Sequence, residues 1–333
     1  MNSANRVLVT GAGGFIGHHL VKRLKAEGCW VRGVDIKEPQ FEATAADDFQ
    51  LLDLRSWHNA LQATSHVGQV YNLAADMGGI GYITAKLAEI ARNNILINAH
   101  MLEAARVNGV KRFLFSSSAC VYAGCKQNVA NVIPLREEDA YPADPEPGYG
   151  WEKLFTEQLC SYYRHDFGLE TRIVRFHNVY GPLGTYEGGK EKAPAAICRK
   201  VALADNNGHI DVWGDGGATR SFMFIEDCLE GLLRLMAGDY REPLNLGTEE
   251  MVSVDELVDL VCDIAGKTVT KRHQPDRPQG VRGRNSDNSR LRSVLGWEPQ
   301  TTLRDGLAVT YRWIEDELRR AGRLERALAY ASD

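Results

Sequence analysis

Two residues four positions apart, Tyr149 and Lys153, have the types and spacing for proton transfer. On a helix they would lie on one face. A lysine ammonium beside a phenol favours the phenolate, which lowers the pKa of the tyrosine and suits it to act as a base near neutral pH. An exposed helical pair is the plain alternative, because this spacing also occurs by chance. The elements around the pair must therefore decide between the two interpretations.

A hydroxyl and a thiol follow a predicted strand upstream of this pair. The apolar segment 111–115 predicts the strand, and Ser118 and Cys120 come directly after it. Doubly wound folds bind their ligands at the carboxyl ends of parallel strands. We therefore predict that Ser118 holds a substrate hydroxyl or carbonyl. For Cys120 the alternative is a buried small apolar side chain, the usual environment of a free cysteine.

A glycine-rich turn near the start of the chain predicts a dinucleotide site. Gly11, Gly14 and Gly17 stand between a predicted strand, 6–10, and an amphipathic helix that ends near Glu27. Glycines at this spacing allow a tight turn, a close approach of the backbone to a pyrophosphate, and close packing of helix on strand. The unpaired N–H groups of the helix would face the phosphates. Phe15 and Ile16 belong to the same predicted cofactor-binding turn.

Two acids are predicted to contact the adenosine half of the cofactor. Asp35 ends the predicted strand 30–35, where a carboxylate accepts hydrogen bonds from the ribose and repels a 2′-phosphate. This favours NAD over NADP, although Arg32 and Lys37 weaken the preference because a nearby cation would accept that phosphate. Asp53 lies at the end of the predicted strand 50–54 and is predicted to meet the adenine.

Strands and helices alternate through the first half of the chain, which predicts an α/β fold with a doubly wound parallel sheet of the Rossmann type. We assign residues 1–180 to this NAD-binding domain, with residues of about 218–240 rejoining it. A smaller α/β lobe, mainly 181–333, is predicted to bind the substrate. The asparagines of a long predicted helix, 85–107, are expected to lie mostly on its surface. The predicted strands of the sheet are 6–10, 30–35, 50–54, 69–75, 111–115 and 171–176.

Composition excludes several classes of protein. The 333 residues are 44% hydrophobic and 25% charged, and the net charge of -5 gives no general attraction to nucleic acid or to acidic membranes. There is no apolar run near membrane-spanning length, and residues 1–5 leave no room for a signal peptide before the first strand. The seven scattered cysteines predict reduced thiols in a cytoplasmic protein, and neither cysteine nor histidine spacing predicts a metal site.

The order of these motifs resembles the extended short-chain dehydrogenase/reductase family, over essentially the whole chain. The resemblance implies that Ser118 and Tyr149 contact the hydroxyl that is oxidised, and that Lys153 holds the nicotinamide ribose. The acidic, proline-containing segment 137–147 resembles members that act on nucleotide sugars. The resemblance also implies a homodimer, formed by the helices that begin near Ala85 and Tyr149.

Five segments resemble one subgroup of that family, the NAD-dependent epimerases that invert C3 and C5 of GDP-mannose: 72–79, 117–122, 175–178, 189–196 and 280–288. This resemblance implies that Cys120 and Lys192 are the base and the acid, although a surface loop lysine is the plain alternative for Lys192. It implies that Ala74 contacts the cofactor. The further implied substrate-binding residues are Gly78, Asn178, Lys200, Ala218, Arg220 and Arg284.

Two other interpretations remain open. The first is another nucleotide-sugar epimerase of the same family, acting at C4 or at C5 alone. The second is a non-catalytic NAD-sensing protein of the same fold, from which the tyrosine or the lysine is typically lost.

Overall fold

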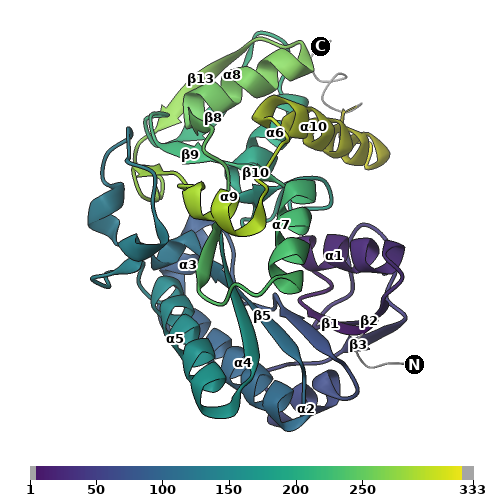
Figure 1. Ribbon diagram of the computed structural model, residues 1–333. Helices are drawn as coiled ribbons and strands as arrows, with labels where there is room; N and C mark the ends of the chain where they lie inside the picture. Colours follow the sequence, from purple (N-terminus) through teal and green to yellow (C-terminus); the bar gives the residue numbers. More distant parts are fainter. Residues whose placement is uncertain (1–4, 325–333) are drawn as a thin grey trace.

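A seven-stranded parallel sheet forms the centre of the computed structural model, which describes residues 5–324 (Figure 1). The strand order is β11-β6-β5-β4-β1-β2-β3. The chain runs outward from β1 on one side and from β4 on the other, so the predicted doubly wound sheet is confirmed. The strands are β1 (Arg6–Thr10), β2 (Trp30–Asp35), β3 (Asp48–Leu51), β4 (Gln69–Asn72), β5 (Arg112–Ser118), β6 (Glu170–Phe176) and β11 (Pro243–Leu246).

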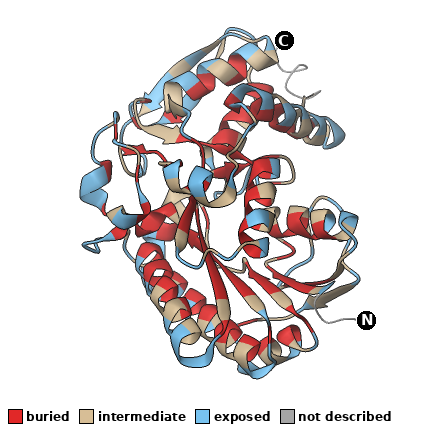
Figure 2. Ribbon diagram, viewed as in Figure 1, coloured by how far each residue is buried: buried red, intermediate tan, exposed pale blue. Residues whose placement is uncertain are grey.

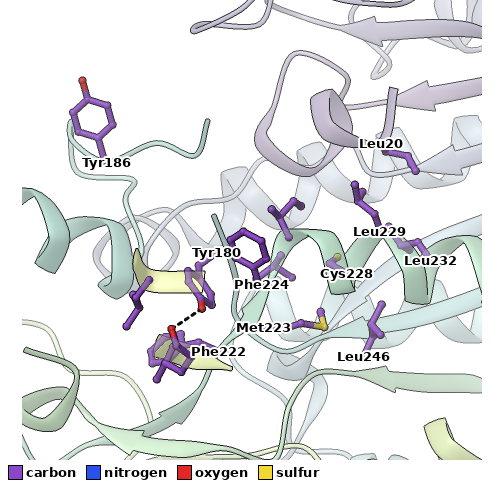
Figure 3. Close-up of a cluster of buried hydrophobic side chains, with 14 of the residues drawn as sticks. Leu20, Tyr180, Tyr186, Phe222, Met223, Phe224, Cys228, Leu229, Leu232 and Leu246 are labelled. Atoms are coloured by element: carbon purple, nitrogen blue, oxygen red, sulfur yellow. Dashed lines mark hydrogen bonds between the residues drawn. The ribbon is translucent and has the colours of Figure 1, made fainter. Parts of the chain in front are cut away.

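Helices cover both faces of this sheet because alternate residues of each strand point to opposite sides. Val7 and Val9 of β1 pack with α1 (Phe15–Ala26) and α7 (Ile225–Ala237). Leu8 packs on the other face, in a second core with residues of α2 (Trp57–Thr64), α4 (Leu87–Val107) and α5 (Tyr149–Phe167). Figure 2 shows the strands of the sheet largely buried between these layers. Figure 3 shows Leu20 of α1 close to Leu229 and Leu232 of α7.

The C-terminal part builds a second group of packed helices, α6 (Ala193–Leu203), α8 (Val254–Ala265) and α10 (Leu303–Arg320). Ser253 and Glu256 form the predicted capping box of α8, with bonds of 3.1 and 2.7 Å between side chains and backbone N–H groups. The remaining strands and α-helices are α3 (Ile80–Ala85), β7 (Val179–Tyr180), β8 (Gly208–Trp213), β9 (Thr219–Ser221), β10 (Met223–Phe224), β12 (Met251–Ser253), β13 (Val269–Gln274), β14 (Gly283–Arg284) and α9 (Ser289–Leu295).

Several predicted boundaries were wrong. The third and fourth strands end earlier than predicted, at Leu51 and Asn72, and β5 runs on through Ser118. The predicted helix 85–107 corresponds to α4, which begins two residues later because Lys86 has a non-helical conformation, with φ -132° and ψ 44°. The helix 149–167 is confirmed, and Gly168 ends it in the left-handed conformation, with φ 70°.

The asparagines of α4 correct the expectation that they lie on its surface. Asn93, Asn94 and Asn98 are all buried. Asn94 donates to Glu152 at 2.9 Å and Asn98 to the same carboxylate at 3.2 Å, so they satisfy an acid buried at the start of α5. Buried polar groups need such partners, and this one lies on another helix.

Within residues 5–324, no helix combines the length and the apolar composition that a membrane span requires. The prediction for the N-terminus concerns residues 1–5, of which 1–4 lie outside the described residues.

Candidate active site

The turn that follows β5 and the start of α5 bring three predicted catalytic residues together. Ser118 ends β5, and Cys120 lies in the short 3₁₀ turn Ala119–Val121. A Cβ atom on Gly150 would lie 2.3 Å from the Cys120 carbonyl oxygen, so only glycine lets α5 approach this closely. Cys120 and Tyr149 share one buried cluster.

Tyr149 and Lys153 lie side by side on α5, as their spacing predicts. The Lys153 Nζ is 5.4 Å from the centroid of the Tyr149 ring and donates to the Ser116 carbonyl at 2.9 Å. Both side chains are buried, so the alternative of an exposed helical pair is excluded. Their chemistry therefore takes place away from bulk water.

The predicted direction of the Tyr149 pKa is reversed in this structure. Burial raises the pKa well above its usual value, and the charge of Glu152 raises it further. A hydrogen bond with Ser118 acts in the opposite direction. Burial also lowers the pKa of Lys153, although the Glu152 charge opposes this change. Desolvation therefore dominates the pKa of Tyr149, whereas the prediction was based on the neighbouring ammonium.

Cys120 is buried, yet it does not have the purely apolar environment of the alternative interpretation. Its Sγ lies 3.6 Å from the Nη1 of Arg284, and the same guanidinium donates to Gln127 at 2.5 Å. Burial raises the pKa of the Cys120 thiol, Arg284 lowers it, and Glu146 raises it. The thiol thus has a cation next to it that stabilises the thiolate.

Lys192 begins α6, as its N-cap residue. The residue as a whole is exposed. Desolvation of its ammonium lowers the pKa, and the nearby Cys120 thiol acts in the opposite direction. A Cβ atom on Gly79 would lie 3.0 Å from the Glu191 carbonyl, which shows that the segment before Lys192 packs against the loop after β4.

Two arginines from neighbouring strands lie next to this group. Arg284 of β14 is the register partner of Arg220 of β9. Arg220 donates to the Thr219 carbonyl at 2.7 Å and to the Val281 carbonyl at 2.5 Å. Burial, and then the charge of Arg284, lower its pKa to about 10. Two neighbouring arginines attract an anion, and arginine suits a phosphate because a guanidinium can bind it through two parallel N–H groups.

The other predicted substrate residues contact parts of the protein other than Cys120. Lys200 donates to the Asp211 carbonyl at 2.6 Å, and Asn178 donates to the Ser221 carbonyl at 3.0 Å. The Ala218 carbonyl accepts from Val254 at 3.0 Å. Gly78 is buried, and a Cβ atom there would lie 3.0 Å from the Tyr82 side chain. Among residues 5–324, no hydrogen bond joins Lys200 or Asn178 to the thiol.

The glycine-rich turn has the geometry of a diphosphate site. Gly11 has φ 71°, and a Cβ atom on Gly17 would lie 2.1 Å from the carbonyl oxygen of Gly11. The first turn of α1 carries no acidic residue. An open pocket lies here, lined by Gly14, Phe15 and residues of the segment after β2. Unpaired N–H groups at the start of a helix bind phosphate, so this turn fits the diphosphate of a dinucleotide. Phe15 and Ile16, the first two residues of α1, carry such groups.

The residues predicted around the adenosine half have mixed positions. Asp35 accepts from Gly13 N at 2.9 Å and from Ile36 N at 2.7 Å, and burial raises its pKa. Arg32 donates to Asp48 at 2.8 Å and to carbonyls at the end of α2, so it is not free to accept a 2′-phosphate. Asp53 lies beyond the end of β3 and pairs with Arg55 at 2.7 Å.

Sequence reasoning missed several residues at both ends of the site. Gly13 is as tightly packed as Gly17, since a Cβ atom there would lie 2.1 Å from the Lys37 carbonyl, and its place among the glycines was a usable signal. Gln127 and Glu146 contact Arg284, but no local pattern in the sequence marks them. Ala74, predicted to contact the cofactor, donates its backbone N–H to Thr10 at 3.0 Å.

Comparisons with known proteins agree with this arrangement. Two relatives named GDP-mannose 3,5-epimerase, from Arabidopsis thaliana and Oryza sativa subsp. indica, are 49% and 50% identical to this chain. Each alignment covers 94% of this chain and 83% or 82% of the relative.

Solved structures of sugar-nucleotide epimerases have the same fold. A Thermotoga maritima UDP-glucose 4-epimerase with UDP-glucose has a TM-score of 0.86 at 26% identity, covering 94% of this chain and 99% of that one. A Thermus thermophilus UDP-glucose 4-epimerase in complex with NAD has a TM-score of 0.80 at 25% identity, covering 93% and 98%. The model of the NAD dependent epimerase/dehydratase family matches residues 7–247. With its doubly wound sheet, glycine-rich turn and buried Tyr149–Lys153 pair, the chain belongs to this family of NAD-dependent epimerases.

Proposed function

We propose that this chain epimerises GDP-D-mannose at C3 and C5 through a 4-keto intermediate, which gives GDP-L-galactose. GDP-L-gulose is the product when C5 alone is inverted. The observation that carries the proposal is a buried thiol, Cys120, in one cluster with Tyr149 and electrostatically coupled to the Lys192 ammonium. The names of the relatives at about half identity support the same substrate.

The first chemical task is oxidation at C4. Bound NAD⁺ supplies reversible hydride acceptance. Tyr149 takes the proton of the C4 hydroxyl, and Ser118 hydrogen-bonds the same oxygen. Lys153 supplies positive charge 5.4 Å from the phenol ring, which favours the phenolate at the moment of proton transfer.

The second task is inversion next to the ketone. A 4-ketone acidifies the hydrogens on C3 and C5, and inversion needs a base on one face of the ring and an acid on the other. Cys120 is the proposed base, because Arg284 stabilises its thiolate. Lys192 is the proposed acid. Return of the hydride to C4 then restores the starting redox state.

The diphosphate of the substrate needs cations. We assign it to Arg220 and Arg284, whose strands hold them as neighbours. The remaining proposed substrate contacts are Gly78, Asn178, Lys200 and Ala218.

We also propose a cytoplasmic homodimer. Trp151 and Phe155, one turn apart on α5, are 50% and 51% exposed, and Tyr162 continues the same face. Leu87, Ile95 and Leu96 of neighbouring α4 are also exposed. Large apolar surfaces of this kind favour burial against a second copy. All seven cysteines are free, which suits a reducing compartment.

Proton NMR of GDP-α-D-mannose incubated with the protein in D₂O tests the activity. The proposal requires deuterium at C3 and C5 and new galacto and gulo signals. Exchange at C5 alone would make the chain a C5 epimerase.

A C4 epimerase is the second candidate, favoured by the likeness to UDP-glucose 4-epimerases. Such an enzyme leaves the hydrogens on C3 and C5 unexchanged. No exchange with GDP-mannose, together with turnover of a UDP-sugar, would therefore replace the proposal with this candidate.

A further inference from the structure

His18, in the first turn of α1, is a buried polar side chain without a hydrogen-bond partner. The residue is 3% exposed, and both ring nitrogens lack a partner. The nearest acid is Glu42, whose Oε2 lies 3.6 Å from the His18 Nε2, which is too long for a hydrogen bond. A buried polar group left in this state is costly, so a partner that binds here would be favoured.

This side chain lines the pocket at the glycine-rich turn. The N-cap of α1 is Gly14, which has no side chain to cap the helix, so the first backbone N–H groups of α1 lack a capping side chain. Gly13, also in the pocket wall, leaves the backbone bare. An anion in this pocket would thus meet backbone donors and an imidazole together.

The charged groups around His18 do not repel an anion strongly. Glu42 is paired with Lys22 at 2.6 Å, so its charge is largely balanced. Lys37 lines the same pocket and is exposed. The neighbouring ring of His19, whose centroid lies 6.3 Å from that of His18, is already bonded to the Pro182 carbonyl at 2.9 Å.

We propose that His18 binds the diphosphate of the dinucleotide cofactor, donating a hydrogen bond from its ring and taking up a proton as the cofactor binds. The proposal rests on NAD as the cofactor and is independent of the sugar substrate. It adds a side chain to a site otherwise built from backbone N–H groups.

Proton uptake has a defined sign. In the free protein, burial lowers the pKa of His18, Glu42 opposes this change, and Lys22 adds to it. A diphosphate within hydrogen-bond distance would raise the pKa in the complex. Between these two pKa values, binding takes up a proton, and affinity rises as the pH falls, by at most about tenfold per pH unit.

Calorimetric titration of the full chain with ADP-ribose tests this inference. ADP-ribose carries the diphosphate and both riboses but lacks the nicotinamide ring, so the redox-active group takes no part in the measurement. Binding heats in buffers of different ionisation enthalpy give the number of protons taken up, across about pH 5 to 8.

The variants His18→Gln and His19→Gln form a matched pair. His18→Gln keeps a donor that does not titrate, so we expect no proton uptake, affinity close to wild type at the alkaline end, and affinity about tenfold weaker at the acidic end. His19→Gln is expected to keep the wild-type uptake.

Equal uptake in wild type and His18→Gln would overturn the proposal, as would no uptake in the wild type. If His18→Gln does not fold, histidine NMR titration of the wild type with and without ADP-ribose replaces it. A raised pKa for His18 supports the proposal, and an unchanged one overturns it. Neither result depends on turnover of GDP-mannose, so failure here leaves the epimerase assay unaffected.

Discussion

The Cys120 thiol is enclosed by protein and yet faces the guanidinium of Arg284 at 3.6 Å. Burial raises the pKa of the sulfur, and the cation lowers it. A thiol acts as a base only as the thiolate, which a nearby cation favours by lowering the pKa. Three predictions at the scale of single residues follow from this environment and from Tyr149.

Cys120→Ser should keep the binding of NAD and GDP-mannose but lose most deuterium exchange at C3 and C5. We expect a loss of about 10² to 10⁴-fold, the usual contribution of a positioned base. Cys125→Ser is the matched control, because Cys125 is exposed, five residues further on. Full exchange in Cys120→Ser would remove the thiol from the mechanism.

Tyr149→Phe should prevent formation of the 4-keto intermediate, because the phenol oxygen is the proposed acceptor of the C4 hydroxyl proton. The measurement is the absorbance of bound NADH, which forms from NAD⁺ when substrate is added. Tyr162→Phe, on the exposed face of α5, serves as control. Normal turnover in Tyr149→Phe would contradict the assignment.

Arg284 and Glu146 should move the pH dependence of ring-proton exchange in opposite directions. Arg284 lowers the pKa of Cys120, so Arg284→Gln should shift the rising limb of the pH profile to higher pH. Glu146 raises that pKa, so Glu146→Gln should shift the limb to lower pH. Arg284→Gln should also raise KM through loss of a phosphate contact. Shifts of the same sign would show that the limb does not report the thiol.

At the scale of elements, the site depends on how closely α5 approaches the turn after β5. Gly150→Ala would place a Cβ atom 2.3 Å from the Cys120 carbonyl and force the two elements apart. We expect a loss of about 1–3 kcal/mol in the free energy of unfolding, typical of overpacking, together with reduced exchange activity. Denaturant unfolding measures the first effect.

Gly124→Ala is the control for this change, since a Cβ atom there would meet nothing within 4 Å. An unchanged stability of Gly150→Ala would mean that the backbone relaxes without cost.

The same elements show how much a sequence can predict. The glycine-rich turn, β1, β2 and the length of α5 follow from local spacing, and all were predicted. The contact between Cys120 and Arg284 spans 164 residues, and Arg284 lies on β14, a two-residue strand without a periodic pattern. The buried asparagines of α4 were misplaced because their polar type predicts exposure, whereas their acidic partner, Glu152, lies on another helix.

For the whole molecule, the exposed apolar face of α4 and α5 predicts the oligomeric state. Phe155→Glu would place a charge within the proposed dimer interface. We expect the Kd of the dimer to rise by at least about tenfold, which corresponds to about 1.4 kcal/mol. Analytical ultracentrifugation measures this. Val309→Glu, at an exposed position of α10, is the control. A monomeric wild type would contradict the proposed assembly.

The last strand to join the large sheet, β11, also has a consequence for synthesis on the ribosome. Asn245 accepts from the Tyr122 hydroxyl at 2.5 Å, and its backbone N–H donates to Glu137 at 3.0 Å, so it satisfies buried groups more than 100 positions earlier in the chain. Until residue 246 leaves the exit tunnel, β6 is an unpaired edge strand, and the Tyr122 hydroxyl and the Glu137 carboxylate lack their bonds to Asn245. The nascent chain must therefore wait, with the other six strands of the sheet already made, for a segment translated long afterwards.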